Sequence, residues 1–296
     1  MTPDPDKIYT DTDIDEAEEK KRAAAKADGK DKDDKDEGEG KDDFVELGKA
    51  MVLAAVIALF IRAFLFEPFN IPSASMYPAL KIGDYLFVEK YSYGYSRYSF
   101  PFGVASFEGR YGSGRPERGD IAVFRQPKKP DIDYIKRIVG LPGDTVQMIE
   151  GRLYINSLLV PREYLGSETV TDADGTRVYQ KYLETLPNGV AHHIYELSDH
   201  DQYDNTGVFV LPERHYFAMG DNRDSSMDSR EQIQVGFVPE DNLVGRAAFL
   251  FFSTESIGDT CVRDGALAAL KSVFCQLVER PRAVRYSRIF SRVHKL

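Results

Sequence analysis

The sequence predicts a mostly β fold with antiparallel sheets, preceded by one transmembrane helix and a disordered N-terminal tail. Three observations lead to this prediction: a polar first segment, a single apolar run, and short β-rich runs separated by turn residues after Pro68. With 296 residues, 42% of them hydrophobic, the chain is long enough to bury a substantial core.

The first segment holds most of the net charge. Residues 1–43 contain 17 acidic and 9 basic residues, a net charge of -8 out of -10 for the whole chain. Because few apolar residues accompany them, the segment cannot bury enough surface to offset the entropy lost on ordering. We expect a disordered acidic cytoplasmic tail, which is either a solvated spacer or an interaction segment.

The apolar run is suited to a membrane. Residues 50–66 read AMVLAAVIALFIRAFLF, interrupted only by Arg62, whose long side chain can reach the lipid headgroups. We therefore expect a transmembrane helix within residues 44–66. A buried core helix is the first alternative, but the flanking tail is strongly polar. A cleaved signal peptide is the second, but the leader is long and charged and no small-residue cleavage site follows.

Lysines flank this run unequally. In the 20 residues after the run Lys81 is the only lysine, whereas the 24 residues directly before it hold six: Lys26, Lys30, Lys32, Lys35, Lys41 and Lys49. Positive residues stay on the cytoplasmic side of a membrane. The tail should therefore be cytoplasmic and the rest of the chain extracytoplasmic.

The remaining chain alternates strand-like runs with turn signals. Glycine, proline and asparagine clusters separate these runs, as hairpins closing into barrel-like sheets require. The runs are DYLFVEKY, DIAVFRQP, YIKRIVGL, DTVQMI, GRLYIN and GVFVLP. We expect a β core in two parts, a distal β subdomain and a helical, basic C-terminal segment, at 67–157, 209–252, 158–208 and 253–296.

Two segments leave alternatives open. The insertion at 91–118 is rich in Tyr, Phe, Gly and Ser, which suits an irregular hairpin or an aromatic face resting on a bilayer. The last 17 residues mix basic and aromatic side chains, which suits docking on anionic headgroups or a solvated terminal helix.

Cofactor chemistry has little support. There is no CxxC, no HExxH and no glycine-rich phosphate loop, so we expect no metal, no cofactor, no nucleotide and no nucleic acid. Cys261 and Cys275 are too few for a disulfide framework, and whether they pair stays open.

Two segments carry residues suited to nucleophilic chemistry. Residues 71–80 read IPSASMYPAL and place two serines between two prolines, five residues beyond the apolar run. In the strand YIKRIV, Lys136 and Arg137 must point to opposite faces, so one of them should point inward. Burial would lower the pKa of Lys136 and make its neutral amine a general base.

A third segment, Gly220–Arg230, reads GDNRDSSMDSR. Its acidic residues suggest a calcium loop, but the spacing differs from an EF-hand and the arginines oppose a cation. An interlocked loop of hydrogen bonds and ion pairs fits better. Such a loop can present the hydroxyl of Ser225 or Ser226 to orient a lysine amine.

A Ser/His/Asp triad is the rival arrangement. No GxSxG or GDSGG context accompanies the histidines, so we expect them to be surface residues: His192, His193, His200, His215 and His294.

The ordered set PSASMYPAL, GDYLFVEK, RGDIAVF with YIKRIVGLPGD, and GDNRDSSMDSR resembles the sequence boxes of bacterial type I signal peptidases, over about residues 64–252. The resemblance implies a signal-peptidase-like antiparallel β catalytic domain. It implies Ser75 as nucleophile and Lys136 as general base, with Ser73 and the Ser75 N–H forming an oxyanion hole. Ser226 would hold the Lys136 amine.

The resemblance also assigns supporting roles. Asp228 and Arg230 would brace the loop, with Asp221 and Arg223 in support. An apolar lining would admit small side chains, hence Ala-X-Ala specificity: Phe69, Ile71, Met76, Leu80, Tyr134 and Ile135. Ser225 and Ala79 depart from the common Asn and Thr, which puts only loop details in doubt.

The implied partners are signal peptides of exported preproteins, the lipid bilayer and, functionally, the protein export translocon. The implied location is the bacterial inner membrane. Two alternatives remain: a maturation peptidase of the conjugative-transfer kind, and an inactive membrane-tethered β domain that binds signal peptides. The second should have lost Ser75 or Lys136, and both are present.

Overall fold

The computed structural model describes residues 44–100, 107–112, 114–172, 175–255, 274 and 284–293. The chain forms two units, Met1–Leu59 and Phe60–Leu296. Among the described residues, the 22-residue helix Phe44–Leu65 is long and apolar enough to cross a membrane. It ends one residue before the expected limit, and its last five residues form the π-helix η1 (Ile61–Leu65). The expected disordered tail and the two cysteines lie outside the described residues.

The second unit is built mainly of β-strands, which confirms the expected fold class. All its strand pairings between named strands are antiparallel. The strands are β1 (Phe66–Asn70), β2 (Asp84–Glu89), β3 (Tyr95–Ser96), β4 (Arg110–Tyr111), β5 (Ile121–Gln126), β6 (Lys129–Gly140), β7 (Thr145–Ile149), β8 (Arg152–Ile155), β9 (Leu158–Leu159), β10 (Arg162–Asp172), β11 (Gly175–Thr185), β12 (Ala191–Glu196), β13 (Phe209–Val210), β14 (His215–Met219), β15 (Val238–Pro239) and β16 (Leu243–Ser253).

Short 3-10 helices connect some of these strands. They are η2 (Ala74–Met76), η3 (Arg97–Ser99), η5 (Arg223–Ser225), η6 (Glu240–Asn242) and η8 (Tyr286–Arg288). Every strand-like run recognised in the sequence overlaps one of the observed strands; β6 begins five residues before its run YIKRIVGL.

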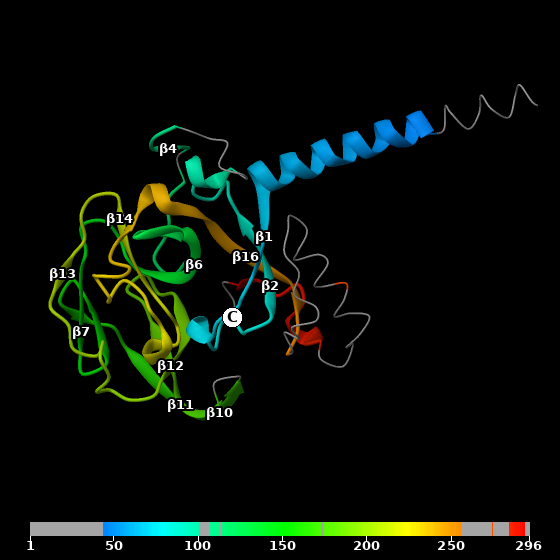
Figure 1. Cartoon of the computed structure of the whole chain (residues 1–296). Coiled ribbons are helices and arrows are strands. Elements are labelled where there is room, and N and C mark those ends of the chain that lie inside the picture. Colours follow the sequence, from blue (N-terminus) through cyan, green and yellow to red (C-terminus); the bar gives the residue numbers. More distant parts are fainter. Residues whose placement is uncertain are drawn as a thin grey trace, which may run out of the picture. The chain divides into compact units, whose positions relative to one another are not determined.

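The largest sheet has seven strands in the order β1-β2-β16-β5-β6-β14-β15. Late in the chain, β16 returns to lie between β2 and β5, so segments far apart in the sequence share this sheet (Figure 1). Its inward side chains pack on the turn that carries η2, through Met76 and Leu80, which are both fully buried. The core therefore fixes the residues between β1 and β2.

Three smaller sheets complete the unit: β10-β11-β12, β13-β7-β8-β9 and β3-β4. Within the four-stranded sheet, β9 pairs with β8 and β13 pairs with β7. This sheet thus ties the two ends of the range 158–208 to the residues that precede it. Within 91–118, β3 and β4 form a short antiparallel pair, and an irregular hairpin is one of the two alternatives for that range.

Two arginines near the C-terminus join the sheet instead of facing solvent. Asp84 at the start of β2 is fully buried and accepts hydrogen bonds from Arg288 Nη2 at 2.6 Å and Arg285 Nη2 at 3.2 Å. Because a buried carboxylate requires a paired charge, these contacts hold the segment 284–293 against β2. These two arginines therefore form ion pairs with Asp84, rather than docking on lipid or facing solvent on a terminal helix.

Candidate active site

The serine turn is a short 3-10 helix whose conformation is fixed by its neighbours. Ser73 is the N-cap of η2, and Tyr77 N donates to Ala74 O at 3.0 Å and Leu80 N to Met76 O at 2.8 Å. Since Met76 and Leu80 are anchored in the core, Ser75, directly before Met76, has little freedom. Its side chain is 8% exposed, so the hydroxyl lies at the edge of the protein interior.

Lys136 reaches this hydroxyl from the middle of β6. Its Nζ lies 2.5 Å from Ser75 Oγ, although 61 residues separate the two in sequence. Burial lowers the pKa of the Lys136 amine to about 8, while Asp228 and Asp221 act in the opposite direction. A neutral amine can therefore be populated near neutral pH and can accept a proton from a hydroxyl.

The other two serines lie close by. Ser73 Oγ is 3.3 Å from Ser75 Oγ, so the two hydroxyls can share a hydrogen bond. Ser226 is also buried, but no hydrogen bond joins its Oγ to Lys136. Ser226 thus lies in the Gly220–Arg230 loop as expected, but it does not form the hydrogen bond expected to orient the Lys136 amine.

The Gly220–Arg230 loop is an interlocked network, as its sequence predicted. Asp228 is fully buried; its Oδ1 accepts from Arg230 Nε at 2.9 Å, and its Oδ2 from Arg230 Nη2 at 2.9 Å and Gly220 N at 3.0 Å. Burial alone would raise the pKa of Asp228, but Arg230 outweighs it and lowers this pKa. Such a doubly bonded pair is stable without water.

The same loop holds the serine turn directly. Asn222 N donates to Ser75 O at 3.2 Å, and Asn222 Nδ2 donates to Ala74 O at 3.1 Å. Asn222 was not singled out in the sequence, where nothing distinguishes it from other polar residues of the loop. Its two contacts fix the distance between the loop and η2.

A second buried ion-pair group lies on the opposite face of β6. Arg137 makes two hydrogen bonds to Asp221, at 2.8 and 2.6 Å, and Arg223 makes two to Glu184. Strand alternation places Lys136 and Arg137 on opposite faces of β6, and both residues are buried. Arg137 can be buried because Asp221 neutralises its guanidinium charge. Glu184 gave no signal in the sequence, since its partner is 39 residues away.

The histidines require one correction. His192 was expected at the surface, but it is 4% exposed and lies 3.4 Å from Glu184 Oε1 and 3.8 Å from Asp221 Oδ1. Burial, aided by the charge of Arg137, lowers its pKa. No described histidine forms a hydrogen bond with Ser75, and His294 lies outside the described residues.

The proposed apolar lining divides into two groups. One hydrophobic cluster beneath the serine turn contains Ile71, Met76, Leu80 and Ile135, with Phe69 packed against it. Tyr134 packs against another cluster, and its ring lies 5.5 Å from Lys136 Nζ. Tyr134 therefore borders the amine rather than the apolar cluster.

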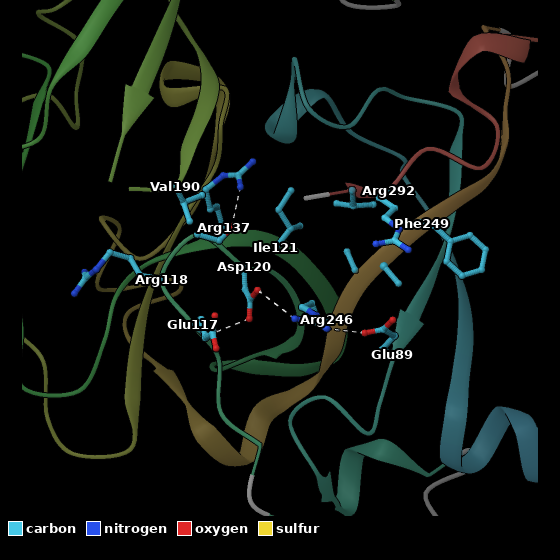
Figure 2. Close-up of a pocket in the computed structure, with 14 residues that line it drawn as sticks. Glu89, Glu117, Arg118, Asp120, Ile121, Arg137, Val190, Arg246, Phe249 and Arg292 are labelled. Atoms are coloured by element: carbon cyan, nitrogen blue, oxygen red, sulfur yellow. Dashed lines mark hydrogen bonds and ion pairs between the residues drawn. The ribbon is translucent and has the colours of Figure 1, made fainter. Parts of the chain in front are cut away.

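A cavity of about 610 Å³ is lined by several charged side chains, among them Arg246, Asp120 and Glu89 (Figure 2), and Ser75 is not one of its lining residues. None of the predicted site residues is among its lining residues, although Arg137, the neighbour of Lys136, is. Several of its charges already have partners: Arg246 Nη2 is 3.0 Å from Glu89, Arg246 Nη1 is 3.9 Å from Asp120, and Arg137 pairs with Asp221. This cavity is therefore not where the Ser75–Lys136 pair would meet a substrate.

Comparisons with known proteins identify the family of this chain. Signal peptidase I of Rickettsia typhi is 47% identical over 207 residues, 67% of this chain and 76% of that protein. Signal peptidase I of Rickettsia canadensis is 45% identical over 215 residues, 70% and 79% of the two chains. The model of the signal peptidase family, peptidase S26, matches residues 44–252. This chain belongs to the signal peptidase family, the S26 serine endopeptidases.

Proposed function

We propose that this chain cuts signal peptides from exported preproteins with Ser75 as nucleophile and Lys136 as general base. The family supports removal of signal peptides. The observation that carries the mechanism is the 2.5 Å contact between Lys136 Nζ and Ser75 Oγ in a buried setting. A desolvated amine next to a hydroxyl is the arrangement that activates a serine without histidine.

The reaction would proceed in two steps. Neutral Lys136 takes the Ser75 proton while Oγ attacks the scissile carbonyl, and the Ser75 N–H and Ser73 hydroxyl stabilise the oxyanion. The protonated amine then gives its proton to the leaving amine. Water, deprotonated by Lys136, hydrolyses the acyl-enzyme and frees Ser75.

Substrate choice would depend on the apolar cluster under the serine turn. Because Ile71, Met76, Leu80 and Ile135 are closely packed and almost fully buried, we expect pockets too shallow for large side chains. This supports specificity for small residues at positions -1 and -3, the Ala-X-Ala pattern.

The membrane setting is part of the proposal. The helix Phe44–Leu65 supports a single membrane anchor with a cytoplasmic N-terminus and an extracytoplasmic domain at the bacterial inner membrane. Substrates would arrive from the export translocon. Docking of the exposed side chains of this helix in lipid would remove them from water.

The test is cleavage of a preprotein bearing an Ala-X-Ala site by the full chain in detergent. We expect cleavage after the second Ala, and its loss in both Ser75→Ala and Lys136→Met. Lys129→Met is the matched control, because Lys129 lies exposed on the same strand. Activity kept in Lys136→Met would require another base, and no cleavage by the wild-type chain would favour an inactive, signal-peptide-binding domain.

A further inference from the structure

Three carboxylates outside the Ser75–Lys136 site converge on one point. Glu196 at the end of β12, Asp204 in the following loop and Asp224 on η5 each place one carboxylate oxygen within 4.8 Å of the others. Glu196 and Asp204 are 1% and 0% exposed, and Asp224 is partly exposed, which leaves a route from solvent.

Two oxygens of this group are buried without a partner. Among the described residues, no donor bonds Glu196 Oε2 or Asp204 Oδ1. The other oxygens are engaged: Glu196 Oε1 accepts from Arg162 at 3.3 Å, and Asp204 Oδ2 accepts from Asp201 N at 2.6 Å. An unpaired buried carboxylate oxygen costs free energy, so a missing cation is a natural partner.

The neighbouring arginines supply only part of that charge, through the 3.3 Å ion pair of Arg162 with Glu196 Oε1. Three guanidinium groups face the cluster, and each bonds a carboxylate outside it: Arg162 with Asp199, Arg223 with Glu184 and Arg230 with Asp228. Asp201 and Asp199 add negative charge nearby.

We propose that Glu196, Asp204 and Asp224 bind a calcium ion. All three ligands are oxygens, which hard divalent cations prefer. Ca²⁺ bonds of about 2.3–2.6 Å can join oxygens on opposite sides of the ion that are about 4.6–5.2 Å apart, whereas Mg²⁺ bonds of about 2.0–2.1 Å reach only about 4.2 Å. The oxygens all lie within 4.8 Å of one another, which is compatible with Ca²⁺ and waters completing its coordination. Because Mg²⁺ gives up its own waters reluctantly and two of the three ligands are buried, Ca²⁺ is the better fit.

A calcium ion at this position would join two loops of the protein. Asp224 belongs to the Gly220–Arg230 loop, while Glu196 and Asp204 flank the loop that follows β12. Asp224 Oδ2 already accepts from Leu197 N at 2.6 Å and Ser198 N at 3.1 Å. A bound ion would clamp these two loops together and stabilise the segment that carries Ser226 and Asp228.

The test uses the full chain in detergent, stripped with EDTA and titrated with CaCl₂ or MgCl₂. We expect CaCl₂ at a hundredfold excess over its Kd to raise Tm by about 5–10 °C, and MgCl₂ to raise it less. Terbium luminescence, excited through tyrosine because the chain lacks tryptophan, should report the same site and fall when Ca²⁺ is added.

The acidic N-terminal tail could also bind Ca²⁺, so variants of the cluster are compared with the wild type in the full chain, where the tail is unchanged. Asp204→Asn and Glu196→Gln should lose the Ca²⁺ shift, while Asp201→Asn, an exposed neighbour, should keep it. In EDTA, Asp204→Asn should be at least as stable as wild type, because it removes an unpaired buried charge. No Tm shift up to about 10 mM CaCl₂, a concentration above the weakest usual sites, would overturn the proposal, as would a shift retained in both cluster variants.

An ordered water is the competing occupant. Arg223 Nε and Arg230 Nη1 are also buried without a partner, and a water could link them to the cluster. That arrangement would give no terbium signal above the Asp204→Asn level and no calcium shift, and it would refute calcium binding.

Discussion

Replacing Lys136 by methionine should stabilise the folded protein at neutral pH. The side chain is 5% exposed, and burial lowers its pKa from 10.5 to about 8. At 1.36 kcal/mol for each pKa unit, this difference of about 2.5 corresponds to about 3 kcal/mol. Methionine has similar length and no charge to desolvate, although it loses the bond to Ser75, worth about 1 kcal/mol.

The sign follows from the protons bound in each state. Below pH 8 the amine is protonated both folded and unfolded, so the fold bears the full cost of the buried charge. Between pH 8 and 10.5 the folded amine is neutral while the unfolded one stays protonated, so the cost falls as pH rises. Above 10.5 both forms are neutral and the cost has gone.

We therefore expect Lys136→Met to raise the free energy of unfolding by about 2 kcal/mol at pH 7, and to lose this gain by pH 10.5. Urea unfolding in detergent at both pH values measures it. Lys129→Met, on the exposed part of the same strand, should change little at either pH. An equal gain at both pH values, or a loss of stability at pH 7, would refute the claim that Lys136 is a desolvated base.

Three further outcomes are expected. The cleavage rate, kcat/KM, should rise about tenfold per pH unit below pH 8 and level off above it, as the Lys136 amine loses its proton; a flat profile from about pH 6 to 10 would contradict this. Gly220→Ala should abolish cleavage, because its Cβ would lie 2.5 Å from Ser75 O, and wild-type kcat would disprove the tight fit. Arg230→Met should cost about 3–5 kcal/mol in urea unfolding by leaving Asp228 buried without its partner, and an unchanged midpoint would show the pair to be dispensable.

Local patterns in the sequence determined much of the architecture. Period-two runs and turn residues predicted the strands, and the apolar run predicted the helix Phe44–Leu65, because these signals depend on nearest neighbours along the chain. The Gly220–Arg230 loop was also predictable as an ion-pair network, since Asp228 and Arg230 are two residues apart.

Residues joined across long sequence distances were not predictable from such patterns. Glu184 and His192 carry no local signal, yet both are buried, because β11 and β12 place them beside Arg223 and Asp221. Arg288 was expected at a surface, but it bonds Asp84, 204 residues earlier.

Ser75 and Lys136 show most clearly what the sequence determines and what the tertiary structure decides. Resemblance to a family named Ser75 and Lys136, and strand alternation placed Lys136 opposite Arg137. Only the tertiary structure decided that the amine is buried and lies 2.5 Å from the hydroxyl. The physical reason is that desolvation depends on every segment packed around a group, whereas sequence patterns report one segment at a time.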